Sequence, residues 1–141
     1  MQIQALTSEQ IPHFTKEQIP SFTTKQIKNF TWKQPFTAEQ IPHFTTKQIA
    51  AIPPIQISWF HDDQIQALTI KQIPVLTSQQ IKWFYYEQIQ VFTKEQIQSF
   101  TTEQISKFTI EQIQALTKEQ IPALTSQQIQ VLNEGAYRRC R

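Results

Sequence analysis

The sequence is an almost unbroken series of eight-residue repeats, and this short period limits the folds open to the chain. Each repeat begins with Gln, which recurs seventeen times from Gln2 to Gln128 in a chain of 141 residues. Ile follows this Gln in every repeat except the one that begins at Gln34. A period this strict indicates a repeat architecture, in which neighbouring units must stack to bury their apolar side chains.

Each repeat has two apolar positions and a signal for the start of a helix. The consensus is Gln-Ile-x-x-[Phe or Leu]-Thr-x-Glu, and all ten Phe of the chain occupy its fifth position. Thr follows the fifth position in thirteen repeats, and the Gln of the next repeat comes three residues after it. Thr and Gln at this spacing form a capping box, in which each side chain accepts a backbone N–H of the other residue. Every repeat therefore predicts the start of a short helix.

The period excludes one long helix and argues against a β-solenoid. Eight residues rotate the apolar stripe of an α-helix by about 80° per repeat, so no single partner would cover it. The corners of a β-solenoid usually need Gly, Asn or Asp, whereas this chain has one Gly. Five prolines follow the repeat Ile and would break a long helix, namely Pro12, Pro20, Pro42, Pro74 and Pro122. Such a Pro fits either at a bend or at the opening of a segment, and the sequence leaves both open.

We therefore predict an all-α fold, a solenoid or superhelix of very short capped helices with one helix per eight-residue repeat. The chain should bend at each junction between the fifth position and Thr, which turns both apolar positions toward a common axis. The predicted domains are a repeat solenoid over residues 1–132 and a basic, non-repeat tail over residues 133–141.

The composition of the repeat region excludes several classes of partner. It carries 10 Lys against 10 Asp and Glu, and all three Arg lie in the tail, so we expect no binding to nucleic acid. No apolar run is long enough to span a membrane, and we expect no membrane association. The single cysteine, Cys140, excludes a disulfide within the chain. The sequence does not indicate a cellular location.

The Gln position predicts a buried structural ladder. Gln occurs in all seventeen repeats, whereas the Glu position also accepts Lys, Gln and Asp, which is typical of a solvated face. We expect the Gln amides to satisfy backbone groups at the bends, and a ligand-binding row is the alternative. The representative members of the predicted ladder are Gln10, Gln18, Gln72, Gln96 and Gln112.

Three stretches depart from the consensus, and these are where a function would be encoded. Residues 29–40 contain a six-residue unit, which predicts a kink or a register shift. Pro and His replace two capping Thr within residues 50–65, and Tyr replaces another within residues 82–89. The last two stretches provide the candidate protein interface: Trp59, Phe60, His61, Trp83, Tyr85 and Tyr86.

A competing interpretation is that these aromatic residues fill core space at distorted bends. Trp59 and Trp83 lie three repeats apart and would stack on one face if the superhelix turned once in about three repeats. No second His or Glu at ligand spacing accompanies His61, so we expect no metal site there, and Asp62 instead acts as a helix cap. We interpret His13 and His43, which share one position of the repeat, as partly exposed residues without a chemical role.

The unit T-x-E-Q-I-x-x-[F or L] resembles the octapeptide repeats that occur in runs within large bacterial repeat proteins. The resemblance covers residues 2–132 and implies a bacterial repeat array without assigning an activity. The stretches T-S-E-Q-I and T-K-E-Q-I are also similar, in the capping box alone, to the repeat opening of the DNA-binding effectors of plant pathogens. Those repeats are longer and have a base-reading loop without a counterpart here, so this likeness implies no DNA-contacting residue.

Together these features predict a protein-binding or scaffolding module from a bacterial protein, with a partner whose identity the sequence does not indicate. The alternative is a purely structural spacer or stalk. We do not expect an enzyme, a cofactor or a metal ion, because the repeats show no catalytic or ligand-binding constellation. Met1 leads directly into the first repeat, so we expect head-to-tail self-association or a further N-terminal neighbour.

Overall fold

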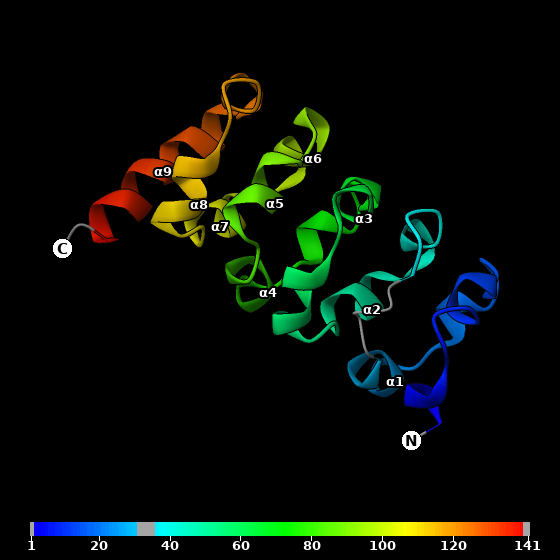
Figure 1. The fold of residues 1–141 in the computed structure, drawn as a ribbon. Coiled ribbons are helices and arrows are strands. Elements are labelled where there is room, and N and C mark those ends of the chain that lie inside the picture. The colour runs from blue at the N-terminus through cyan, green and yellow to red at the C-terminus, as the bar shows by residue number, and fades with distance from the viewer. Residues whose placement is uncertain (1, 31–35, 140–141) are drawn as a thin grey trace.

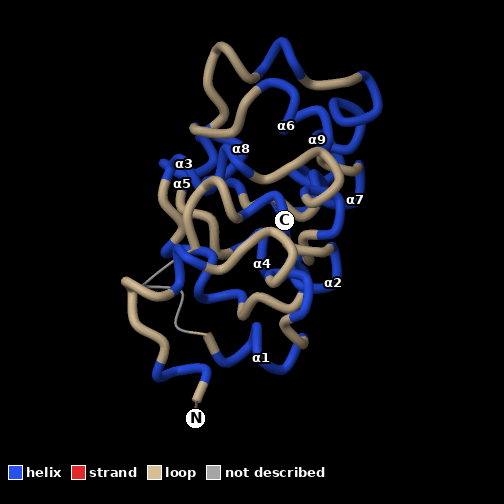
Figure 2. The backbone as a smooth tube through the Cα atoms, turned by 90° about the vertical axis from the view of Figure 1, so that its right-hand side faces the viewer, coloured by secondary structure: helices blue, strands red, loops and turns tan. Residues whose placement is uncertain are grey.

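The chain forms a superhelix of short helices that winds about a common axis (Figure 1). The computed structural model describes residues 2–30 and 36–139, with side chains described as far as Leu132. Helices and short extended corners alternate, and the described residues contain no strand (Figure 2). Each described repeat contributes one short helix, which confirms the predicted all-α solenoid.

The helices are of two kinds, α and 3-10. The α-helices are α1 (Thr24–Asn29), α2 (Thr46–Ala50), α3 (Asp62–Ala67), α4 (Ser78–Lys82), α5 (Tyr86–Gln90), α6 (Lys94–Ser99), α7 (Thr102–Ser106), α8 (Ile110–Ala115) and α9 (Ser126–Arg139). The 3-10 helices are η1 (Ile3–Ala5), η2 (Ile11–His13), η3 (Ile19–Ser21), η4 (Ile41–His43), η5 (Pro54–Trp59), η6 (Ile73–Val75) and η7 (Ile121–Ala123). Helix α9 begins in the last repeat and continues into the tail.

The capping boxes form as the sequence predicts. At α6, the Thr93 hydroxyl accepts the Gln96 backbone N–H at 3.2 Å, and Gln96 Oε1 accepts the Thr93 N–H at 2.9 Å. The same reciprocal pair starts α1, α2, α4, α7 and α8. These pairs satisfy amide groups that the first turn of a helix would otherwise leave without partners.

The bends lie at the junction of the fifth position and Thr. Phe22 has φ −63° and ψ 135°, and Thr23 has φ −77° and ψ 161°, so two consecutive extended residues redirect the chain. Any L-residue adopts these angles without strain, and no described residue has a positive φ. The chain therefore turns at every repeat without needing Gly.

Proline lies within the helical segment, before the bend. Pro20 is the second residue of η3, and the bend follows at Phe22. Ahead of it, the Thr15 carbonyl still accepts the N–H groups of Gln18 and Ile19, both at 3.0 Å. All five repeats with Pro after Ile form 3-10 helices, because Pro removes the donor that would extend an α-helix.

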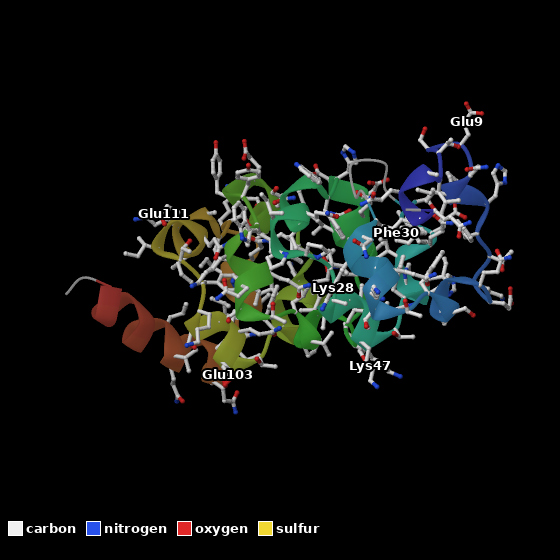
Figure 3. All side chains as sticks on the ribbon, turned by 90° about the horizontal axis from the view of Figure 1, so that it is seen from below. Glu9, Lys28, Phe30, Lys47, Glu103 and Glu111 are labelled. Carbon is white, nitrogen blue, oxygen red and sulfur yellow. The ribbon has the colours of Figure 1, made fainter. Side chains whose placement is uncertain are left out.

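The fifth-position side chains pack along the inside of the superhelix. Phe rings of successive repeats meet edge to face, with ring centroids 4.8–5.3 Å apart. Phe30 is one of these buried rings, whereas charged side chains such as Glu9, Lys47 and Glu103 point outward (Figure 3). Edge-to-face contacts of this kind add stability beyond the burial of apolar area.

The Gln side chains join successive turns of the superhelix. Gln96 Nε2 donates to the carbonyl oxygens of Ile65 and Leu68, both at 2.8 Å, and these residues belong to the fourth repeat before it. The same pair of bonds, at 2.7–3.1 Å, is made by Gln40, Gln48, Gln72, Gln80, Gln88, Gln104, Gln112, Gln120 and Gln128. Helices three repeats apart, such as α5 and α8, are also in contact, so one turn contains between three and four repeats.

The predicted Gln ladder is thus correct for the inner turns and wrong for the first. Gln72, Gln96 and Gln112 are buried and make the bonds between turns. Gln10 and Gln18 are exposed, and each accepts a Thr N–H through Oε1 at 3.0 Å. Their Nε2 atoms make no bond to a preceding turn, because no described turn precedes them.

The short unit does not change the number of repeats in a turn. Residues 31–35, which include the first two residues of this unit, lie outside the described residues, and so does the predicted kink. Beyond it, Gln40 Nε2 donates to the Ile11 and Phe14 carbonyls at 2.9 and 3.0 Å, again four repeats back. Phe36 is 1% exposed and packs between Phe30 and Phe44. The predicted shift of register between turns is therefore not observed.

Candidate functional site

Two corners of the superhelix keep only half of the capping box. The backbone N–H groups of His61 and Tyr85 donate to the Oε1 atoms of Gln64 and Gln88 at 2.7 and 2.8 Å. Neither His61 nor Tyr85 makes a side-chain hydrogen bond to cap its helix. Because such a cap contributes about 1 kcal/mol, each of these helices lacks a stabilising contact that most other repeats have.

The corner at Tyr85 exposes three large aromatic side chains. Tyr85 is 58% exposed, Tyr86 56% and Trp83 42%. Phe84, which lies between them in the sequence, is buried in the core. Aromatic residues of this size are common in protein interfaces, where they bury a large area at a small entropic cost.

The preceding turn adds apolar residues to the same corner. Gln80 Nε2 donates to the Ile52 carbonyl at 2.9 Å, and Gln88 Nε2 donates to the Ile57 carbonyl at 3.1 Å. These bonds hold residues 81–87 alongside residues 53–56, and helices α4 and η5 are in contact. Ile55 is 51% exposed there, and Pro53 and Pro54 are half-buried. We name the combined surface the aromatic corner: Pro53, Pro54, Ile55, Trp83, Tyr85 and Tyr86.

The structure divides the sequence-predicted interface residues into two groups. Trp83, Tyr85 and Tyr86 lie together at the aromatic corner. Phe60 is 5% exposed and belongs to the core, and the half-buried Trp59 packs against that core. Their packing is the arrangement that the competing interpretation describes.

Trp59 and Trp83 do not stack. The helices beside them, η5 and α4, are in contact, but Trp59 packs against the core whereas Trp83 is 42% exposed. Residues 53–55 were not among the predicted interface residues, although the break in the consensus marks their stretch. Recognising them requires the alignment of adjacent turns, because the bonds from Gln80 and Gln88 are what place them beside residues 83–86.

The His and Asp residues of the second break lie at the start of α3. His61 occupies the cap position of α3, so Asp62 is the first residue of the helix instead of its cap, which corrects the sequence prediction. No group of three or more His, Cys, Asp or Glu that would hold a metal ion occurs among the described residues. His13 and His43 occupy equivalent positions in adjacent turns, and both are exposed.

Within the described part of the chain, no helix has the length and apolar character needed to cross a bilayer. The chain matches no protein-family model, and neither curated proteins nor solved structures include one that is similar to it. The aromatic corner therefore defines the candidate site through its own geometry.

Proposed function

We propose that the chain is a protein-binding or scaffolding module that presents its aromatic corner to another protein. The observation that supports this proposal is the replacement of the capping Thr by Tyr85. A capping Thr is absent there, and three aromatic side chains are exposed at the same corner. This replacement does not stabilise the local fold. Exposed Trp and Tyr, however, are residue types that contribute strongly to binding energy at protein interfaces.

The rest of the superhelix supplies a rigid support for this surface. The backbone beside the corner is fixed by hydrogen bonds from Gln80 and Gln88 to the preceding turn. An aromatic surface held on a rigid backbone loses little conformational freedom on binding. A spacer without a ligand is the competing function, and the regularity of the remaining repeats is what favours it.

Restoration of the consensus at the corner provides a direct test. The variant Trp83→Ser/Tyr85→Thr/Tyr86→Lys uses residues found at these positions in other repeats and restores the cap, so it should fold at least as well as the native chain. Both proteins would be used to capture partners from a lysate of the source organism, with quantitative mass spectrometry as the readout. We expect partners that the native chain retains and the variant loses.

A matched control separates recognition from general stickiness. Thr101→Tyr/Thr102→Tyr, added to the triple variant, moves two exposed tyrosines to a corner that has consensus residues in the native chain. A specific partner should not return with this control. Equal capture by the native chain and the triple variant would exclude the aromatic corner as the interface, and no capture by either would favour the spacer.

A further inference from the structure

The bonds between turns have a direction. Each repeat donates from its Gln to the preceding turn and offers the carbonyls of its Ile and fifth residue to the following turn. The repeat Ile is likewise covered by the following turn, and the inner ones, such as Ile65, Ile81 and Ile97, are fully buried. The first and last turns therefore present different faces.

The first turn presents unused donors. Gln10 and Gln18 hold the Thr7 and Thr15 N–H groups through Oε1, but among the described residues their Nε2 atoms have no acceptor. Both side chains are exposed, whereas the same residue in the inner turns, for example Gln96, is buried.

The last turn presents the matching acceptors. Within the described residues no hydrogen bond reaches the carbonyl oxygens of Leu116 and Leu124, whereas the equivalent Leu68 carbonyl accepts Gln96. Ile121 is 49% exposed and Ile129 is 51% exposed, although the Ile of the inner turns are covered. This end of the superhelix thus combines open acceptors with an open apolar surface.

We propose that the first turn of one copy of this chain binds the last turn of a second copy, head to tail. The step that relates turns within the chain, from a Gln to the fourth repeat before it, supplies the register. Continued beyond the last turn, the step places Gln10 of one copy on the Ile113 and Leu116 carbonyls of the other. The same step places Gln18 on the carbonyls of Ile121 and Leu124. The contact repeats geometry that the chain already uses between its own turns.

The two faces lie at opposite ends of the superhelix (Figure 1). An interface between unlike faces is heterologous, and one that follows a screw operation does not close into a ring. The expected product is an open-ended series of copies that continues one superhelix.

The assembly state of the native chain is the first measurement. Sedimentation velocity over a concentration series, with a reductant present because the chain has one cysteine, should show a mean mass that rises without reaching a fixed oligomer. A monomer at every concentration up to the limit of solubility would overturn the proposal.

Variants of each face provide the sharper test. Gln10→Glu/Gln18→Glu keeps a side-chain oxygen that accepts the Thr N–H but replaces the amide donor with a second acceptor, so the fold should remain while association is lost. Ile121→Asp, at the half-exposed Ile of the last turn, should block the other face. Each variant should raise the apparent Kd at least about tenfold and leave the circular dichroism spectrum unchanged.

Mixing the two variants identifies the mode of contact. Each variant retains one intact face, so an equimolar mixture should form a one-to-one dimer and nothing larger. A mixture that stays monomeric, or a Gln10→Glu/Gln18→Glu variant that assembles like the native chain, would overturn head-to-tail binding.

Discussion

At the residue scale, the three hydrogen bonds of the repeat Gln explain why no other residue replaces it. Its Oε1 accepts a Thr N–H within the same corner, and its Nε2 donates to two carbonyls of the preceding turn. Glu would accept but not donate, and Lys would donate but not accept. Only an amide with the reach of Gln serves both the helix start and the contact between turns.

Replacing an inner Gln should destabilise the fold strongly. In Gln96→Leu, the Leu68 carbonyl and the Thr93 N–H lose their partner, and the Ile65 carbonyl keeps only the Leu68 N–H. Each buried group left unsatisfied costs about 1–3 kcal/mol. We expect a loss of more than ~3 kcal/mol in the free energy of unfolding, measured by urea titration. The neighbouring Glu95→Ala, on an exposed side chain, should change it by less than ~0.5 kcal/mol. Similar effects of the two changes would mean that the bonds between turns contribute little.

The aromatic corner predicts a gain of stability on mutation. Tyr85→Thr supplies the missing hydroxyl acceptor for the Gln88 N–H and should raise the free energy of unfolding by ~1 kcal/mol. Thr93→Ala removes the same acceptor at α6 and should lower it by a similar amount. Thermal melts of both variants check the pair, and a Tyr85→Thr protein less stable than the native chain would show that Tyr85 supports the fold.

At the scale of the element, none of these helices would persist alone. Most span three to six residues, well below the length at which an isolated helix is stable in water. Their stability comes from contacts with the adjacent turns, and so the repeat tolerates either an α or a 3-10 segment. The choice depends mainly on whether Pro follows Ile.

This tolerance predicts that proline is accepted at one position and rejected at the next. Gln98→Pro in α6 reproduces the arrangement of the proline repeats and should cost less than ~1 kcal/mol, far below the usual ~3 kcal/mol within a helix. Ser99→Pro removes an N–H whose counterpart, that of Ser21, donates to the Gln18 carbonyl, and it should cost ~3 kcal/mol. Urea unfolding measures both, and an equal loss would contradict the equivalence of the α and 3-10 repeats.

The elements were predictable from the sequence because their signals are local. The capping box spans Thr93 and Gln96, four consecutive residues, and the bend follows from extended angles at two neighbouring positions. The placement of Pro before the bend was not predictable, because both positions are compatible with its missing N–H. In the structure, Pro lies within the helical segment. The Thr15 carbonyl accepts the N–H groups of Gln18 and Ile19, so it does not need an N–H from Pro20.

At the scale of the molecule, the bonds of the repeat Gln reach the fourth repeat before it, whereas helices three repeats apart, such as α5 and α8, are in contact. This spacing between turns could not be read from the sequence. It depends on how far a Gln side chain reaches and on the width of the packed Phe column, which are properties of three-dimensional packing. The same dependence on packing explains two differences from the sequence prediction. Trp59 lies against the core while Trp83 is exposed, and the exposure of Gln10 depends on which turn covers it.

Because the repeats are equivalent, the molecule should tolerate the loss of a whole repeat but not of part of one. Deletion of residues 96–103 joins Glu95 to Gln104 and restores an unbroken series, so the protein should still unfold cooperatively with a modest loss of stability. Deletion of residues 96–99 removes a Gln and an Ile and displaces the following fifth position. We expect that protein to lose its cooperative melt, as followed by circular dichroism at 222 nm.

The superhelix makes the number of repeats an angular variable as well as a length. Adding one repeat to such an array rotates everything beyond it by roughly a quarter to a third of a turn. The six-residue unit counts as a full step, since Gln40 still bonds to the fourth repeat before it. Arrays that differ by one repeat would therefore point their aromatic corners and their terminal helices in different directions, so repeat copy number alone can reorient whatever the superhelix carries.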